Sequence, residues 1–366
     1  MPDILILADT LRSPEMRREL PLAMVDPGIF IERDGHRKAW VTGFEIGRVT
    51  AVSDVEAVGL EELGFDELTA GGMSYAEALH QVVIVRACHA AGVTEAVVPR
   101  AFPLEAAEAL AAAGIGVQSD GPGFDRRRRA KTPEQVAGIR RAQRACESAM
   151  EAVRAALRRD NVTSEDLHSA IAHAFVDAGM IPVPAIASHG PQVASVHHNG
   201  SGPILSSESV VVDIFPMDPE SGCYSDMTRT FCIGEPPAEL RQYHELVAEA
   251  LARAKSAAGP GVPGSVVFGA AAEVFESAGL PTLRTKGPNE VLDRGFLHGL
   301  GHGVGLEIHE DPYLHLSDDP LLPGDVITLE PGAYRPGFGG CRLEDIALIT
   351  EDGCEVLTNY RYDLAP

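Results

Sequence analysis

Residues 209–231 place the strictest limit on the fold, because they put two aspartates inside one apolar hairpin. The segment reads SVVVDIFPMDPESGCYSDMTRTF, and its turn MDPESG predicts two antiparallel strands around it. A hairpin symmetric about the Pro219–Glu220 bond would set Asp213 opposite Asp226, with Cβ atoms about 4.5–5.5 Å apart. The Val210–Val212 run indicates that this pair is buried. The fold must therefore relieve the repulsion between two carboxylates.

Three arrangements can satisfy such a pair of acids. The two carboxyl groups can share one proton, as in a carboxylate dyad. They can hold a cation between them. Alternatively, the strands pair in a different register and one aspartate points into solvent. The hairpin alone leaves all three arrangements open.

Two more acids lie in apolar strands further along the chain. Residues 325–350 read DVITLEPGAYRPGFGGCRLEDIALIT, in which Glu330 ends one predicted strand and Glu344 lies in the next. The preceding segment FLHGLGHGVGLEIHED (296–311) carries three histidines, with glycine at every second position from Gly299 to Gly305. Four such acids beside a histidine loop indicate a metal cage. We expect the glycines, which have no side chains, to let backbone and substrate approach the metals.

A ligand set of mostly oxygen with one imidazole suits two divalent ions that share bridging carboxylates. Two such ions, about 3.5–4 Å apart, can hold a hydroxide between them and clamp a carbonyl or phosphoryl oxygen. A structural zinc site would favour cysteine ligands. The six cysteines are scattered and form no C-x-x-C pair, so we expect free thiols in a reducing cytoplasm.

The chain is long enough for two domains, at 366 residues. Residues 1–125 alternate short strands and helices around a hairpin signal at Asp34-Gly35, which predicts a small α/β domain. Residues 131–366 mix longer helices with strands and show no short-period repeat. The predicted fold class is therefore α/β (α+β), with the boundary at 125–131.

The boundary segment contains four consecutive arginines, at positions 126–129, which we interpret as a solvated linker. A helix begins directly after it, because Thr132, Pro133 and Gln135 form an N-cap, a favoured first helical residue and a capping box. We expect helices over Tyr75–Ala91, Pro103–Ala113, Thr132–Arg159, 164–178, 237–257 and 265–278, and strands over Ala96–Val98, 210–216, 224–232, 324–330 and 342–349.

Several classes of function are disfavoured by composition and by missing motifs. A formal net charge of −23 repels phosphate backbones, so we expect neither nucleic acid nor anionic membrane as a partner. No run of 18 apolar residues occurs, and the first twenty residues lack a basic region before their short apolar run, so we expect no signal peptide and a cytoplasmic location. G-x-S-x-G, H-E-x-x-H and P-loop patterns are absent, which argues against serine hydrolases and nucleotide binding.

Four strings in order resemble the pita-bread-fold metallopeptidases, a family that includes prolidase, aminopeptidase P and methionine aminopeptidase. The strings are SDMTRTF, HGLGHGVGLEIHEDP, ITLEPGAY and CRLEDIALI. The resemblance covers 131–366 strongly and 1–125 more weakly, as the smaller α/β domain found in prolidase, aminopeptidase P and creatinase. It implies a creatinase-like N-terminal domain followed by a pita-bread catalytic domain. The chain length favours the proline-specific branch, because methionine aminopeptidases usually lack the first domain.

The resemblance implies a role for each of the five ligand positions. Asp213 would bind the first metal alone, and Asp226 and Glu344 would bridge the two metals. His302 and Glu330 would complete the second metal site, with Glu330 also moving protons. A metal-bound hydroxide would attack the scissile carbonyl, and the metals would stabilise the resulting oxyanion.

The resemblance also implies residues that act on the substrate or behind the ligands. His298 and His309 match the flanking histidines that contact the substrate and the developing gem-diolate. His197 resembles an upstream pocket histidine, with the adjacent His198 as the alternative. The two residues expected to orient ligands are Arg342 and Thr228.

One departure from the family concerns the hairpin. Asp213 and Asp226 are thirteen residues apart, two more than the family usually has, and Asp213-Ile-Phe-Pro replaces the usual D-x-G. An insertion of two residues keeps both side chains on one face of the hairpin. We therefore expect the metal site to survive, while the hairpin tip and the choice of substrate differ.

The expected activity is a dinuclear metal-dependent hydrolysis of the Xaa-Pro bond at the N-terminus of dipeptides or peptides. The ligand chemistry favours Mn²⁺ or Co²⁺, with Zn²⁺ or Fe²⁺ as alternatives, and relatives of this kind imply a homodimer. A second interpretation is the hydrolysis of another small amide on the same fold. A third is a binding module without catalysis. The presence of all five ligand positions argues against a metal-free, creatinase-like mechanism.

Overall fold

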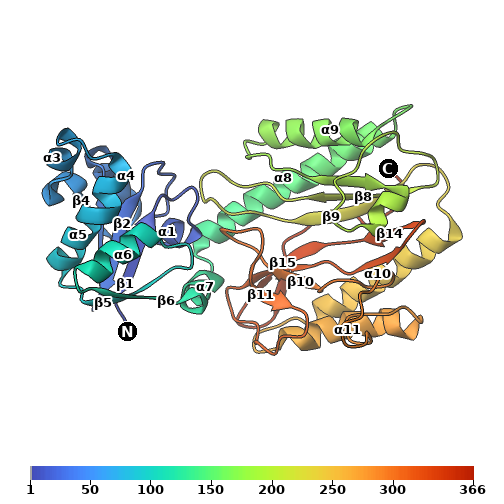
Figure 1. Cartoon of the computed structure of the whole chain (residues 1–366). Helices are drawn as coiled ribbons and strands as arrows, with labels where there is room; N and C mark the ends of the chain where they lie inside the picture. Colours follow the sequence, from blue (N-terminus) through green and yellow to red (C-terminus); the bar gives the residue numbers. More distant parts are fainter. Residues whose placement is uncertain (1) are drawn as a thin grey trace. The chain divides into compact units, whose positions relative to one another are not determined.

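A computed structural model of the chain describes residues 2–366, and contacts divide it into two units (Figure 1). Unit 1 comprises residues 2–128 with Glu220–Gly222, and unit 2 comprises Arg129–Pro219 with Cys223–Pro366. Both units combine helices with sheets, which confirms the α/β class expected from the sequence. Among the described residues, no helix combines the length and the apolar character that crossing a membrane requires.

Unit 1 is a six-stranded mixed sheet with helices on both faces, in the strand order β4-β3-β2-β1-β5-β6. Alternate residues of the central strand feed two separate cores: Leu5 and Leu7 pack with α5 and α6, whereas Ile4 and Ile6 pack with α1, α2 and α7. The strands are β1 (Ile4–Ala8), β2 (Gly28–Arg33), β3 (His36–Val41), β4 (Glu56–Gly59), β5 (Glu95–Val98) and β6 (Gly116–Ser119). The helices are α1 (Pro14–Glu19), η1 (Gly43–Glu45), α2 (Ile46–Val52), η2 (Leu60–Leu63), α3 (Phe65–Ala70), α4 (Tyr75–Glu77), η3 (Ala78–Val83), α5 (Ile84–Ala91), α6 (Leu104–Ala112) and α7 (Gly121–Arg129).

The predicted hairpin at Asp34-Gly35 is confirmed. Arg33 pairs with His36 across a two-residue turn, and both turn residues have positive φ, 51° at Asp34 and 81° at Gly35. Two consecutive left-handed residues are what a type I′ turn requires, and Asp-Gly is among the pairs that adopt it most readily. The predicted helix over Tyr75–Ala91 is also present, as α4, η3 and α5 in succession.

The interpretation of the arginine run as a solvated linker is wrong. Its residues belong to α7, and Arg128 and Arg129 are only 5% and 8% exposed. Arg129, the first residue of unit 2, donates to Asp325 of the same unit, with Nη2 2.6 Å from Oδ2. A guanidinium can be buried where a carboxylate accepts two parallel hydrogen bonds from it, and no local pattern identifies that carboxylate. The capping box at Thr132 and Gln135 then begins α8 as expected.

Unit 2 contains two sheets, each covered by a pair of helices, and a separate hairpin (Figure 1). The sheet β7-β8-β9 packs against α8 and α9, and the sheet β11-β10-β12-β15-β16 packs against α10 and α11. The helices are α8 (Pro133–Leu157), α9 (Ser164–Asp177), η4 (Gly190–Ala194), α10 (Ala238–Ala257) and α11 (Gly264–Ser277). The strands are β7 (Ile186–His189), β8 (Ser209–Ile214), β9 (Met227–Cys232), β10 (Gly301–Gly303), β11 (Glu310–Leu314), β12 (Val326–Leu329), β13 (Gly332–Arg335), β14 (Gly339–Arg342), β15 (Asp345–Ile349) and β16 (Cys354–Val356).

The two halves of unit 2 share a long repeat that a search for short periods does not find. Residues 161–180 read NVTSEDLHSAIAHAFVDAGM, and residues 261–280 read GVPGSVVFGAAAEVFESAGL. The helices α9 and α11 lie in these stretches with bounds offset by one hundred residues. Both end before a glycine of positive φ, 74° at Gly179 and 77° at Gly279. Each half then contributes two acids, the aspartates of the β8–β9 hairpin in one and Glu330 with Glu344 in the other.

The hairpin of the two aspartates forms, but its predicted register is wrong. Asp213 pairs with Thr228, two positions beyond its predicted partner Asp226, and Ile214 pairs with Met227, so Asp226 lies just before β9. The turn is shifted toward the second strand. Because a shift by two residues preserves the face of every side chain, Asp213 and Asp226 remain on the same side of the hairpin.

The strand predicted over 342–349 is also not continuous. Arg342 ends β14, which pairs with β13, and Asp345 begins β15, which pairs with β12. Glu344 lies between them, and its N–H donates to the carbonyl of Thr228 at 3.0 Å. Glu344 therefore lies between β14 and β15, next to Thr228 of β9, and not inside a strand. We call this junction of residues 343–344 with Thr228 the seam.

Candidate metal centre

A cavity of about 420 Å³ in unit 2 is lined by all the predicted metal ligands, by the predicted substrate-contacting residues and by Arg342. Those residues are His197, Asp213, Asp226, His298, His302, His309, Glu330, Arg342 and Glu344. The other lining residues are mainly apolar or aromatic: Ile186, Val196, Phe215, Gly299, Gly301, Ile308, Tyr313 and His315. The cavity therefore combines ionisable side chains with apolar ones.

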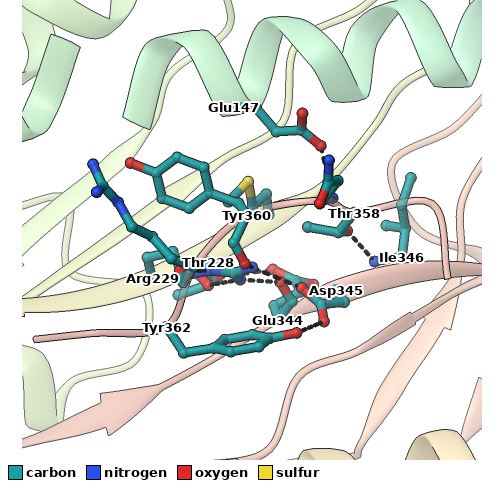
Figure 2. Close-up of polar contacts among 12 residues, drawn as sticks. Glu147, Thr228, Arg229, Glu344, Asp345, Ile346, Thr358, Tyr360 and Tyr362 are labelled. Carbon is teal, nitrogen blue, oxygen red and sulfur yellow. Dashed lines mark hydrogen bonds and ion pairs between the residues drawn. The ribbon is translucent and has the colours of Figure 1, made fainter. Parts of the chain in front are cut away.

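Three of the predicted ligands form a compact group. Asp226, His302 and Glu344 each offer a ligand atom, and these atoms all lie within 4.8 Å of one another. All three residues are buried, with exposed fractions of 4%, 6% and 2%. Glu344 is fixed on one side, because the Thr228 hydroxyl donates to its Oε2 atom at 2.8 Å (Figure 2). The structure thus places Thr228 in contact with Glu344, one of the predicted ligands.

The other two predicted ligands adjoin this group without belonging to it. Glu330 follows β12, and its Oε1 atom lies 3.6 Å from Nε2 of His302. Asp213, in β8, accepts a 2.6 Å bond from Nη2 of Arg342 through its Oδ2 atom. Its other oxygen, Oδ1, is buried and has no hydrogen-bond donor.

The acids of the cavity have strongly perturbed pKa values. Burial raises the pKa of Glu330 to about 8. Burial, and then the neighbouring carboxylates, raise the pKa of Asp226 and of Glu344 well above the usual range. Carboxylates this close together and this far from water repel one another, and a cation among them would remove that penalty.

His302 is held in the tautomer that a metal ligand needs. Its Nδ1 atom lies 3.0 Å from the carbonyl oxygen of Gly303, which can only accept a proton, so Nδ1 carries the hydrogen. The Nε2 atom is then the unprotonated one, and it faces the Oδ2 atom of Asp226 at 3.8 Å. Burial lowers the pKa of His302 to about 3, so the ring is neutral and its lone pair is available.

The glycines around His302 also allow the strands of the sheet to pack closely. A Cβ atom on Gly301 would lie 2.1 Å from the carbonyl oxygen of Thr328, and one on Gly303 would lie 2.3 Å from that of Asp311. These glycines let neighbouring strands approach β10 closely, and Gly301 in addition lines the cavity. Their absent side chains allow β10 to lie between β11 and β12, with His302 directed at the acids.

Arg342 connects the predicted ligand Asp213 to Tyr334, a residue for which the sequence predicted no role. Besides holding Asp213, Arg342 donates through Nη1 to the hydroxyl of Tyr334 at 3.1 Å. That hydroxyl lies 3.0 Å from Nε2 of His298, whose Nδ1 donates to Gly299 at 2.8 Å. Burial lowers the pKa of His298 to about 3, so Tyr334 donates to a neutral ring. The signal in the sequence was the aromatic residue of ITLEPGAY, because a buried tyrosine requires a hydrogen-bond partner.

The remaining histidines lie at the cavity wall. The rings of His309 and His302 are perpendicular, with centroids 4.2 Å apart. His197 lines the cavity, whereas His198 accepts a hydrogen bond from the backbone N–H of Gly200 in its own loop. Of the two alternatives for the pocket histidine, the structure therefore brings His197 to the site.

The donor set and its unsatisfied atoms fit a divalent cation. The Oδ1 atoms of Asp213 and Asp226 are buried without a hydrogen-bond donor, and the Nε2 lone pair of His302 points at the same group of acids. Buried polar atoms are rarely left without a partner. Oxygen donors with one imidazole are also the chemistry that divalent metals of the first transition row accept.

Comparison with known proteins also indicates a metal-dependent peptidase family. A family model described as metallopeptidase family M24 matches residues 137–351. A probable dipeptidase PepE of Mycobacterium tuberculosis is 36% identical over 204 residues, which cover 55% of this chain and 51% of the relative. An Xaa-Pro dipeptidase of Pyrococcus furiosus is 42% identical over 141 residues, 38% of this chain and 37% of the relative. The match with the first of these curated relatives thus spans about half of the relative's length.

Solved structures match over almost the whole chain. An X-Pro aminopeptidase from Thermotoga maritima has a TM-score of 0.81 at 22% identity, covering 98% of this chain and 96% of that one. A dipeptidase PepE from Mycobacterium ulcerans has a TM-score of 0.76 at 26% identity, covering 100% and 92%. The fold expected from the resemblance is confirmed, and the family model spans more than half of the 366 residues. The chain belongs to metallopeptidase family M24 and adopts the pita-bread fold.

Proposed function

We propose that the chain is a peptidase that uses two divalent cations to hydrolyse the bond between an N-terminal residue and proline. The single observation that supports this most strongly is the group of Asp226, His302 and Glu344, with its tautomer-fixed imidazole and unsatisfied carboxylate oxygen. Asp213 and Glu330 complete the ligand set. The preference for proline is supported by the relatives named Xaa-Pro dipeptidase.

The cations would supply a Lewis acid for the scissile carbonyl and an activated water. The chain's own residues would then do the rest. Glu330 would move the proton, as the family resemblance implies; its Oε1 atom lies 3.6 Å from Nε2 of His302. His309 and His197 would bind the substrate from the open wall, and Arg342 would hold Asp213 in place through its 2.6 Å bond. The apolar lining of the cavity would receive the proline ring, which needs no hydrogen-bond partner.

Mn²⁺ or Co²⁺ is the proposed pair of ions, because four of the five donors are carboxylates. Zn²⁺ and Fe²⁺ are the alternatives.

As implied by the family resemblance, we also propose a homodimer in the cytoplasm, with residues 131–366 as the catalytic domain and 1–125 as the accessory domain. Sedimentation equilibrium of the purified chain tests the oligomeric state.

A panel of substrates with added Mn²⁺ or Co²⁺ tests the function. We expect cleavage of Xaa-Pro dipeptides, of longer peptides that begin Xaa-Pro, or of both, and no cleavage of peptides that begin with Met and lack proline at the second position. Cleavage of only the Met-starting peptides would overturn the proposed specificity. Cleavage of only non-peptide amides would favour the alternative hydrolase, and metal binding without any cleavage would favour the binding module.

Replacement of His309 separates substrate handling from metal binding. We expect His309→Ala to lower kcat on an Xaa-Pro dipeptide by about 10²-fold, a typical cost of removing one group that stabilises the transition state. The Mn²⁺ stoichiometry should remain that of the wild type, because His309 is not among the ligands. Steady-state kinetics and calorimetric titration measure the two effects, and loss of bound Mn²⁺ would contradict the assignment.

Phe215 is expected to limit the size of the first residue of the substrate. It stands where the family usually has the glycine of D-x-G, and its side chain lines the cavity. Phe215→Ala should enlarge the cavity and raise kcat/KM for dipeptides with a bulky first residue relative to Gly-Pro. A difference of one or two methylene groups in an apolar pocket changes such ratios by about 10–200-fold. An unchanged ratio across Gly-Pro, Leu-Pro and Phe-Pro would contradict this role.

A further inference from the structure

Arg229 lies immediately behind the seam that carries Glu344. Successive side chains of a strand point to opposite faces, so Thr228 reaches Glu344 while Arg229 turns to the other side of β9. Arg229 is only 1% exposed. On that side it contacts Asp345, the residue after Glu344, with Nη2 2.8 Å from Oδ1 (Figure 2).

All five N–H groups of the Arg229 guanidinium have an acceptor, which is the full number that the group can use. Two of these bonds come from one atom, Nη1, and end on the two backbone carbonyls of the seam. The others reach Asp345 and the last residues of the chain. The five acceptors are the carbonyl oxygens of Thr228 (2.9 Å), Glu344 (2.7 Å), Tyr360 (3.1 Å) and Arg361 (2.9 Å), and Oδ1 of Asp345 (2.8 Å).

Tyr362 closes this arrangement from the C-terminal segment. Its hydroxyl donates to Oδ2 of Asp345 at 2.5 Å and accepts from Nζ of Lys255 at 2.7 Å. Its ring lies under the guanidinium, with the centroid 4.6 Å from the central carbon of Arg229. Asp345 is fully buried, so Arg229, Lys255 and Tyr362 together compensate a carboxylate that water does not reach.

We propose that Arg229, held by Asp345 and by the segment Tyr360–Tyr362, is a positioning residue that sets Glu344 for cation binding. Its Nη1 atom ties the carbonyl of Thr228 to that of Glu344, and this fixes the distance over which the Thr228 hydroxyl holds the Glu344 carboxylate. The inference rests on the proposed function, because Glu344 is a ligand only if the cavity binds metal. On this proposal, the segment Tyr360–Tyr362 contributes to the metal affinity, although it lies far from most of the ligands along the chain.

A purely structural role would have a different signature. Buried ion pairs contribute little net stability compared with apolar residues of the same size. Their geometric precision, in contrast, is what partners behind a metal ligand supply, and replacing such partners typically weakens metal binding 10–100-fold. The metal affinity, rather than the melting temperature, therefore distinguishes the two roles.

The test compares two variants of this network with a matched control in the full-length, metal-stripped protein. Arg229→Lys keeps the charge and loses the fork that spans the two carbonyls, and Tyr362→Phe removes one hydroxyl. The control is Tyr360→Phe, since the Tyr360 hydroxyl donates to Glu151 at 2.7 Å and accepts from Arg154 at 3.1 Å, away from Asp345. Mn²⁺ affinity by calorimetric titration and the visible spectrum of the Co²⁺ form are the readouts.

We expect Arg229→Lys to weaken Mn²⁺ binding on the order of tenfold and to change the Co²⁺ spectrum. Tyr362→Phe should change both in the same direction by less, and Tyr360→Phe should leave both at the wild-type values. Wild-type binding in both network variants would overturn the inference while leaving the proposed function intact. Weakened binding in Tyr360→Phe equal to that in Tyr362→Phe would also overturn it, as a general effect of the segment. No divalent cation bound by the wild type would overturn the proposed function, and this inference with it.

Discussion

Glu344→Gln is expected to lower kcat/KM for an Xaa-Pro dipeptide by more than about 100-fold. Partners that only orient metal ligands already cost 10–100-fold when replaced, and Glu344 is proposed to contact both cations. The glutamine side chain has nearly the same shape, keeps one oxygen for the Thr228 hydroxyl and loses only the charge. Asp226→Asn should have an effect of the same size, because Asp226 is the other proposed bridge. Steady-state kinetics at saturating Mn²⁺, with circular dichroism to verify the fold, measure the loss.

The matched control is Asp218→Asn. Asp218 is a buried acid in the turn of the β8–β9 hairpin, as Asp226 is, but it does not line the cavity. Asp218 is 2% exposed and forms two hydrogen bonds with Arg141, so its replacement disturbs the hairpin without touching the ligands. We expect this variant to retain wild-type kinetics and Mn²⁺ dependence. Full activity in Glu344→Gln, or equal losses in Glu344→Gln and Asp218→Asn, would contradict the bridging assignment.

Removal of divalent cations is expected to lower the melting temperature of the wild type. Without a cation, three acids with raised pKa values share one buried cavity. A cation that binds only the folded state stabilises it by about 2.7 kcal/mol when present at 100 times its Kd. For a unit of this size that corresponds to a shift on the order of 5–10 °C. Scanning calorimetry with a chelator, and again after adding Mn²⁺, measures the difference.

Asp226→Asn provides the reciprocal measurement. In the metal-free state this variant should melt at or above the temperature of the metal-free wild type, since one of the mutually repelling carboxylates becomes neutral. Addition of Mn²⁺ should then shift its melting temperature far less than that of the wild type. A wild-type melting temperature that is the same with chelator and with Mn²⁺ would refute the cation site.

The sequence was sufficient for those parts of the fold that local rules determine. Alternation and turn chemistry gave the Asp34-Gly35 hairpin, and the Thr132–Gln135 capping box gave the start of α8. The acids of the β8–β9 hairpin and the histidines of residues 296–311 predicted a common site, and the structure brings those residues together in one cavity. The family resemblance supplied the specific roles, which geometry alone does not assign.

Most of the errors have one physical cause: a partner that lies far away along the chain cannot be inferred from the local sequence. The arginine run looked solvated because Asp325, its partner, is almost two hundred residues away. The predicted hairpin register was wrong for a local reason, because it assumed a turn symmetric about MDPESG, whereas the turn is shifted. The shift by two residues left both aspartates on the same face of the hairpin. No role was predicted for Tyr334 or Arg229, because their roles depend on the residues that they contact in the fold and not on a sequence motif.

We propose that five residues of this cavity bind two divalent ions that are needed for Xaa-Pro hydrolysis. The most direct test is a titration of the metal-stripped protein with Mn²⁺ while the release of proline from an Xaa-Pro dipeptide is followed. We expect no release without metal and a rate that reaches its plateau at two ions bound per chain. Release of proline by the metal-free protein, or no release at any ratio of Mn²⁺ or Co²⁺, would contradict the claim.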